Sequence, residues 1–381
     1  MTQPASYDAA RLLTDLLKRV SRSFYLTLAA LPSGLREAMG LGYLFARAAD
    51  TIADTDLIPR SKRLELLLSF RAQFVHDRVD AAAVKVIQTA LLPHQHESGE
   101  RILLEQLDAC FRLLAAMPSG DQERIRRLMP TLTRGMELDL AFFPGDTVKD
   151  LTALPGLASL DQYTYFVAGC VGEFWTAMTC AHRPSLAGWN VEDMSAKGVR
   201  FGKGLQLTNV LKDVAKDLQR GRCYLPQPLL AECGLTPADL LKRENIDRAR
   251  PVMRRLAGMA VEHLDVGWAY TMAIPRREVR LRLACMWPIL LAGETLARVV
   301  TSPDLLDAAK SVKVSRGVVY RVMASTILTG ACGCLATAYW GYLRKQVVRE
   351  RTSPTALVFC ISAGNPFCAL QHVTVRVTIE L

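Results

Sequence analysis

Two groups of oxygen-bearing side chains in this 381-residue sequence are spaced so that their members could bind a metal ion together. The first group lies in FARAADTIADTD, residues 45–56, where Asp50 and Asp54 are four residues apart. On a helix, that spacing places both carboxylates on one face, where like charges repel each other. Asp56 falls outside this face, and we interpret it as a charge at the helix end or in the following loop. Because the neighbouring residues are largely apolar, we expect the two carboxylates to need a ligand that compensates their mutual repulsion.

The second group lies in GKGLQLTNVLKDVAKDLQRGRCYLP, residues 202–226, where Asn209, Asp213 and Asp217 repeat at four-residue intervals. These three side chains share one stripe of a predicted helix. Hard divalent cations prefer oxygen ligands, and Mg²⁺ divides its coordination among carboxylates, water and phosphate oxygens. If the two acidic helices face each other across a cavity, they predict a Mg²⁺-dependent clamp for a diphosphate.

Either acidic motif alone is weak evidence, because a D-x-x-x-D pattern arises by chance about once in a chain of this length. The alternative for each motif is an ordinary solvated helix face. Two such motifs, each with an arginine nearby, favour a functional site instead. Arg47 lies one turn before Asp50, and Arg222 follows Asp217.

The composition favours a small anionic ligand over nucleic acid. The formal charge of +10 suits nucleic acid, an acidic membrane surface or a phosphorylated small molecule. The sequence contains no dense Lys/Arg block interleaved with aromatic residues and no nucleic-acid-binding motif. Ten cysteines without metal-type spacing indicate buried thiols in a reducing cytoplasm, and six scattered histidines disfavour a zinc site. We therefore expect a cytoplasmic protein without a nucleic-acid partner.

Helical periodicity runs through most of the chain, with apolar residues every three or four positions, as in residues 8–20 and 101–117. It predicts one large all-α domain over residues 1–345. The tail, 346–381, mixes Pro, Gly and β-branched residues, and we expect disorder or a short strand pair there. The uncharged stretch 322–343 is long enough to span a bilayer but is diluted by Gly, Ser and Thr. We expect it to be the closing helix of the fold, with membrane contact or a membrane span as the alternatives.

From about residue 15 to about residue 325, the chain resembles the squalene and phytoene synthases, a family of head-to-head prenyltransferases. The resemblance is carried, in order, by SRSFYLTLAALP (21–32), YLFARAADTIAD (43–54), YTYFVAGCVGEFW (163–175) and LQLTNVLKDVAKDLQRGRCYLP (205–226). It implies the all-α isoprenoid-synthase fold around a central apolar cavity. It also implies condensation of two farnesyl diphosphate molecules, and we expect a monomer.

Within that family, the segments WPILLAGETLARVV (287–300) and SVKVSRGVVYRVM (311–323) resemble squalene synthases most. The second segment implies NADPH binding, with Lys313 and Arg316 as contacts for the cofactor's phosphates, and a reductive step that yields squalene. Ser315 departs from the basic residue common there, and Ala53 and Thr55 make the first acidic motif less acidic than in many squalene synthases. The alternatives are a synthase of presqualene diphosphate, dehydrosqualene or phytoene. From another class, a non-catalytic prenyl-diphosphate binder or membrane scaffold remains an alternative.

The resemblance also implies roles for individual residues. The expected Mg²⁺ ligands are Asp50, Asp54, Asn209, Asp213 and Asp217, and Asn209 also belongs to the cofactor-binding set. The expected substrate-binding residues are Ser21, Arg22, Phe24, Tyr43, Arg47, Gln206, Lys212 and Arg222.

The catalytic residues are expected to be the four aspartates together with Tyr163, which resembles the tyrosine proposed in the family to assist proton loss. A free tyrosine is a poor base near neutral pH, so released diphosphate is the alternative proton acceptor. Tyr165 is the competing tyrosine. The apolar cavity would shield carbocations from water and stabilise them by aromatic faces. Its candidate lining residues are Phe24, Phe166, Phe174 and Trp175, each of which could equally be an ordinary core residue.

Overall fold

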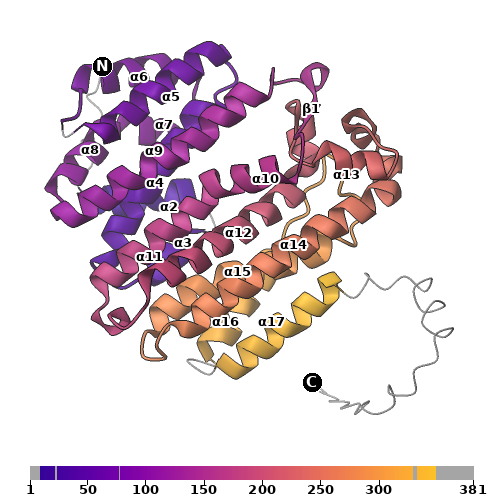
Figure 1. Cartoon of the computed structure of the whole chain (residues 1–381). Helices are drawn as coiled ribbons and strands as arrows, with labels where there is room; N and C mark the ends of the chain where they lie inside the picture. The colour runs from indigo at the N-terminus through magenta and orange to yellow at the C-terminus, as the bar shows by residue number, and fades with distance from the viewer. Residues whose placement is uncertain (1–8, 22–23, 77, 329–332, 349–381) are drawn as a thin grey trace.

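The computed structural model describes residues 9–21, 24–76, 78–328 and 333–348, and these are almost entirely helical (Figure 1). Arg22 and residues 349–381 of the predicted tail therefore lie outside the described residues. The helices are α1 (Ala9–Arg11), α2 (Leu17–Ser21), α3 (Phe24–Ala30), α4 (Leu35–Asp54), α5 (Arg60–Val75), α6 (Ala81–Leu91), α7 (Ser98–Glu105), α8 (Leu107–Ala116), α9 (Ser119–Phe142), α10 (Leu157–Thr164), α11 (Cys170–His182), α12 (Val191–Gln219), α13 (Gln227–Glu232), α14 (Ile246–Ala273), α15 (Val279–Val299), α16 (Arg316–Leu328) and α17 (Gly333–Val348). The all-α prediction is confirmed.

Helix α12 runs through the middle of the molecule and packs against α11 and α14 (Figure 1). Asn190 caps its N-terminus, because the Asn190 side chain accepts a hydrogen bond from the backbone N–H of Asp193 at 3.2 Å. Its contact with α11 is unusually close, because a Cβ on Gly172 would lie 2.0 Å from the carbonyl oxygen of Gly198. Glycine at this crossing lets the two helices approach to backbone contact.

The core has two large groups of buried side chains. One group, around α4, α5, α8 and α9, contains four phenylalanine rings whose centroids lie 4.9–6.4 Å apart: Phe45, Phe70, Phe74 and Phe111. The other group lies around α12, α14, α15 and α17. Phe201 of α12 packs against both groups. The apolar periodicity of the helices therefore becomes continuous packing on both sides of α12.

The only strands in the described part of the chain are two short segments beside the acidic end of α12. Strand β1 (Thr152–Ala153) pairs in parallel with β2 (Arg222–Cys223). The turn between α12 and β2 needs Gly221, which has a φ of 74°. This small sheet fixes the position of Arg222 just beyond the C-terminal end of α12.

The uncharged stretch 322–343 is divided between two helices, α16 and α17, so the prediction of one closing helix was wrong. Trp340 of α17 is buried, stacks on Trp268 of α14 with a centroid distance of 6.1 Å, and donates to Asp265 at 2.9 Å. Among the described residues, no helix is both long enough and apolar enough to cross a membrane. At least in α17, the apolar residues of this stretch therefore pack against α14 and α15.

Candidate active site

A cavity of about 560 Å³ opens between α4, α9, α11 and α12, with α3 and α15 contributing further wall. Most of its wall is apolar, as at Leu132, Met136 and Phe201. The predicted site residues that line it are Phe24, Tyr43, Asp50, Asp54, Tyr163, Phe174, Trp175, Gln206, Asn209, Asp213, Asp217 and Arg222. Both acidic groups therefore face one cavity, although they lie more than 150 residues apart in the sequence.

The first carboxylate pair lies in the last two turns of α4, where residues four apart share a face. Burial, with the neighbouring charge of Asp54 as the second cause, raises the pKa of Asp50 to about 7. Arg47 opposes this shift from a distance of 3.7 Å. The Asp50 side chain nevertheless keeps 46% of its surface accessible, so a ligand in the cavity can reach it.

The second carboxylate pair lies on the C-terminal half of α12. Burial raises the pKa of Asp217 to about 7, with Asp213 as the second cause, while Arg222 acts in the opposite direction. The ammonium group of Lys212 lies 2.6 Å from a carboxylate oxygen of Asp213. Of this pair, Asp217 is therefore the carboxylate whose negative charge is less well compensated by a nearby cation.

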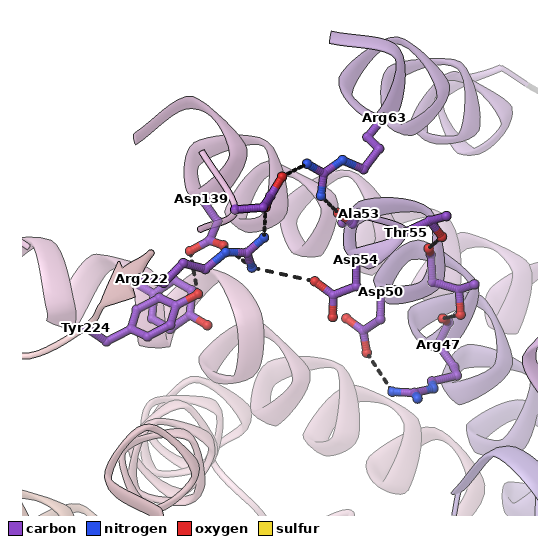
Figure 2. Close-up of polar contacts among 12 residues, drawn as sticks. Arg47, Asp50, Ala53, Asp54, Thr55, Arg63, Asp139, Arg222 and Tyr224 are labelled. Atoms are coloured by element: carbon purple, nitrogen blue, oxygen red, sulfur yellow. Dashed lines mark hydrogen bonds and ion pairs between the residues drawn. The ribbon is translucent and has the colours of Figure 1, made fainter. Parts of the chain in front are cut away.

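Arg222 reaches across from the α12 side of the cavity toward α4 (Figure 2). Its guanidinium lies 3.6 Å from Asp54 of α4, 3.1 Å from Asp139 of α9 and 3.3 Å from Asp146 in the loop that follows α9. Burial lowers its pKa, but Asp139, Tyr224 and Asp54 outweigh that effect and raise the pKa well above the ordinary value. One arginine thus links three elements at the acidic end of the cavity.

Tyr163 lines the cavity, whereas Tyr165 does not. Its ring stacks on Tyr224 with a centroid distance of 4.6 Å, and its hydroxyl lies 3.4 Å from the amide nitrogen of Gln206. Burial, with Asp139 as the second cause, raises the pKa of Tyr163 well above its ordinary value. At neutral pH this hydroxyl is therefore a hydrogen-bonding group rather than a base.

The other predicted residues that the structure describes do not contribute to the cavity wall. Arg47 pairs with Glu100 of α7 as well as with Asp50, and the buried hydroxyl of Ser21 donates to the carbonyl oxygen of Leu17 at 2.5 Å. Lys313 and Arg316 are exposed at the start of α16. Phe166 packs against the backbone of Gly135, behind the wall.

Sequence reasoning missed Asp139, Asp146 and Tyr224. Asp139 keeps 11% of its side chain exposed and accepts a hydrogen bond from the Tyr224 hydroxyl at 2.8 Å. Burial raises its pKa to about 6, although Arg222 and Tyr224 act in the opposite direction. The available signal was the run ELDLAFFPGD, in which two aspartates flank an apolar helix end and a Pro-Gly turn.

The donor set of the cavity fits Mg²⁺ better than a softer metal. Among the described residues, no three His, Cys, Asp or Glu side chains converge to hold one metal ion. The site instead offers aspartate pairs on two helices, with oxygen donors only and with Asp50 and Asp54 accessible. Mg²⁺ typically takes one or two protein carboxylates and completes its coordination with water and phosphate oxygens.

The sequence matches the family model described as squalene/phytoene synthase over residues 17–318. It is 24% identical over 321 residues to a squalene synthase of Schizosaccharomyces pombe, covering 82% of this chain and 64% of that protein. It is 29% identical over 268 residues to a bifunctional lycopene cyclase/phytoene synthase of Pyrenophora tritici-repentis, covering 68% and 42%. The chain thus spans less than two thirds of the length of either relative.

Two solved structures share the fold. A complex of TcSQS with the ligand BPH1237 superposes with a TM-score of 0.71 at 21% identity, covering 90% of this chain and 98% of that one. A dehydrosqualene synthase in complex with a ligand gives a TM-score of 0.55 at 20% identity, covering 83% and 95%. The predicted isoprenoid-synthase fold is confirmed.

Proposed function

Because the chain belongs to the squalene/phytoene synthase family, we propose that it condenses two farnesyl diphosphates head to head and reduces the product to squalene. The supporting observation is that two aspartate pairs and Arg222 lie at one end of a largely apolar cavity. Such a cavity suits a ligand with an anionic head and a long hydrocarbon tail. Prenyl diphosphates are ligands of this kind.

In the first half-reaction, the allylic C–O bond of one substrate breaks and the electron pair leaves with diphosphate. Asp50 and Asp54 would hold Mg²⁺ from one wall, and Asn209, Asp213 and Asp217 would hold it from the other. Bound Mg²⁺ would supply the positive charge that stabilises the departing diphosphate. Arg222 would add a planar donor group that matches phosphate oxygens, and Lys212, Arg22 and Arg47 would contribute further positive charge.

The double bond of the second substrate then attacks the allylic cation, and loss of a proton closes the cyclopropane ring of presqualene diphosphate. We assign the released diphosphate as the proton acceptor, because the raised pKa of Tyr163 makes its phenolate inaccessible near neutral pH. Tyr163 would orient that diphosphate or the reacting carbon through its hydroxyl. Phe174, Trp175 and Tyr43 line the cavity, where they would exclude water and stabilise cations by their faces.

In the second half-reaction, presqualene diphosphate ionises, rearranges and accepts a hydride. NADPH would supply this hydride, and the exposed Lys313 and Arg316 are the residues we assign to its phosphates, with Asn209 on the cavity side. Ser315 lies between them where a basic residue is common in squalene synthases. A second candidate function, formation of presqualene diphosphate, dehydrosqualene or phytoene without this reduction, is favoured by that departure and by the similarity to phytoene synthase-containing proteins.

The deciding experiment incubates the protein with Mg²⁺ and either farnesyl or geranylgeranyl diphosphate, with and without NADPH, and identifies the products by mass spectrometry. Squalene that forms only with NADPH supports the proposal. Presqualene diphosphate or dehydrosqualene formed equally in both reactions would assign the second candidate function, and conversion of geranylgeranyl diphosphate alone would assign a phytoene synthase. A non-catalytic binder would give no product, and Asp54→Ala and Asp217→Ala would leave its biological role intact.

We also propose that residues 1 to about 348 form one catalytic domain that acts as a cytoplasmic monomer, with membrane contact confined to its C-terminal part. The boundary moves three residues beyond the predicted 345 because α17 continues through Val348 and Val347 is buried in its packing. Analytical ultracentrifugation and membrane fractionation, with and without residues 322–381, test these assignments.

A further inference from the structure

Arg63, in the first turn of α5, is the largest fully buried side chain among the described residues. Only 1% of its surface is exposed, and it does not line the cavity. A buried guanidinium without strong partners is severely destabilising, so the contacts of Arg63 indicate its structural role. Both of its contacts lead to the acidic end of the cavity (Figure 2).

The first contact of Arg63 fastens the C-terminal end of α4. Its Nη1 donates to the carbonyl oxygen of Ala53 at 3.0 Å. Carbonyl groups in the last turn of a helix lack intrahelical partners and form the negative end of the helix dipole. The next residue, Asp54, is one of the predicted metal ligands, so Arg63 holds the backbone directly before it.

The second contact of Arg63 is an ion pair with Asp146, in the loop after α9. The same carboxylate accepts from Arg222, which lies 3.3 Å away and also contacts Asp54. Both arginines lower the pKa of Asp146. Asp146 is therefore a shared anion between two cations, and it ties Arg63 to Arg222.

These contacts form a closed circuit from Arg63 to Ala53, along one peptide to Asp54, across to Arg222 and back through Asp146. Figure 2 shows the part of it that runs from Arg63 through Ala53 and Asp54 to Arg222. The circuit spans α4, α5, the loop after α9 and β2. These elements come from three separate parts of the sequence. Removal of one member would take away one of the restraints that hold the carboxylate of Asp54 near the guanidinium of Arg222.

We propose that Arg63 is a positioning residue for the diphosphate end of the cavity, which sets the distance between Asp54 and Arg222 without touching substrate. This inference rests on the proposed function for the chemical class of the ligand, a diphosphate with Mg²⁺. Lysine cannot replace arginine in this role, because one ammonium group cannot reproduce the fixed fork that serves a carbonyl oxygen and a carboxylate at once.

The test compares Arg63→Lys with Arg71→Lys. Arg71 is a matched control, because it lies on the same helix and pairs with Glu137 at 2.6 Å but does not line the cavity. We would measure kcat and KM for farnesyl diphosphate, the Mg²⁺ concentration for half-maximal rate, and calorimetric binding of inorganic diphosphate in the presence of Mg²⁺. Circular dichroism and the melting temperature report folding separately.

We expect Arg63→Lys to lower kcat by about 10- to 100-fold and to weaken diphosphate binding by about tenfold, as for other residues that orient ligands. The control should stay within about twofold in both. In an Arg222→Lys background, Arg63→Lys should weaken diphosphate binding much less, because the two residues act through one circuit. A purely structural role would lower the melting temperature and leave diphosphate affinity per folded molecule unchanged, which would overturn the inference.

If Arg63→Lys does not fold, Asp146→Asn interrupts the same circuit with little change of shape, and the same losses are expected. Unchanged diphosphate affinity in that variant refutes the inference. The calorimetric measurement also separates this inference from the proposed function. Wild-type protein that binds Mg²⁺-diphosphate but does not convert farnesyl diphosphate refutes only the proposed function. Wild-type protein that forms squalene while Arg63→Lys matches it in every measurement refutes only the role of Arg63.

Discussion

Replacing Asp217 with asparagine should make the metal-free protein more stable while it abolishes activity. Burial and the neighbouring charge of Asp213 raise the pKa of Asp217 from 3.8 to about 7. Between these pH values the folded state binds a proton that the unfolded state has released. Stability therefore falls as the pH rises through this window, and above pH 7 the folded state carries the full cost. Asparagine has nearly the same shape and cannot ionise, so it removes that cost.

The size of the gain follows from the shift. About three pKa units at about 1.4 kcal/mol each give an upper bound of about 4 kcal/mol. Partial solvent access to Asp217 reduces this to about 1–3 kcal/mol, since charges that water can reach are screened. A domain of this size gains about 2 °C in melting temperature per kcal/mol, so we expect an increase of about 2–6 °C at pH 8.

The assay is thermal unfolding of wild type and Asp217→Asn in EDTA at pH 8 and at pH 5. The gain should be largest at pH 8 and should shrink at pH 5, where the wild-type carboxyl is already protonated in the folded state. Asp247→Asn is the control, because 84% of the Asp247 side chain is exposed, and it should give no gain. A variant that is no more stable than wild type at pH 8, or equally stabilised at both pH values, would refute the electrostatic account. Mg²⁺ with inorganic diphosphate should raise the melting temperature of wild type but not of the variant.

Three further predictions concern the fold. Gly172→Ala should destabilise the protein by about 1–3 kcal/mol and reduce activity, because its Cβ would lie 2.0 Å from a backbone oxygen of α12. Its control, Gly341→Ala, has open space around the new Cβ and should stabilise α17 by up to about 1 kcal/mol. Denaturant unfolding measures both changes in stability. Burial and the charge of Arg200 lower the pKa of His263 to about 4, so stability should fall as the pH drops from about 6.5 to 4, and His263→Gln should flatten that part of the wild-type stability curve. Trp340→Ala should cost about 3–5 kcal/mol, because it empties a buried ring site on α14 and α15, and calorimetry should detect loss of α17 before global unfolding.

Local spacing was enough to predict which faces carry the aspartates. The interval of four residues places Asp50 with Asp54, and Asp213 with Asp217, in any regular helix. Their convergence on one cavity was not a local property, and it was inferred from the unlikelihood of two such motifs and from the family resemblance. The structure supplies the physical cause of that convergence, which is the packing of α4 and α12 around a shared cavity.

Residues whose roles depend on distant partners could not be identified from sequence. Arg63 lies in RSKRLELLLSF and resembles a surface charge, but its partner Asp146 is 83 residues away. Arg47 was predicted as a phosphate ligand, and nothing near it in the sequence indicates its pairing with Glu100, 53 residues away. Ion pairs of this kind are set by tertiary packing, for which helical periodicity contains no information.

The uncharged stretch 322–343 was misread for a different reason. Its hydropathy was taken to represent one continuous helix, although Gly330 and Gly333 lie near its middle. Glycine in a helix interior costs about 1 kcal/mol relative to alanine, so this pair weakened the case for continuity. Composition indicated that the stretch is apolar, and glycine placement was the better guide to its division into α16 and α17.

The pKa pattern separates two kinds of aspartate at the acidic end of the cavity. Asp146 lies between Arg63 and Arg222, and their positive charges lower its pKa. Burial, with a neighbouring aspartate as the second cause, raises the pKa values of Asp50 and Asp217 to about 7, and the nearby arginines only partly oppose that shift. A carboxylate already paired with arginine gains little from a metal, whereas an uncompensated one gains both charge neutralisation and relief of repulsion. The arginines therefore hold the framework together, and the electrostatic cost that remains in the two helical pairs is what a divalent cation with diphosphate would remove.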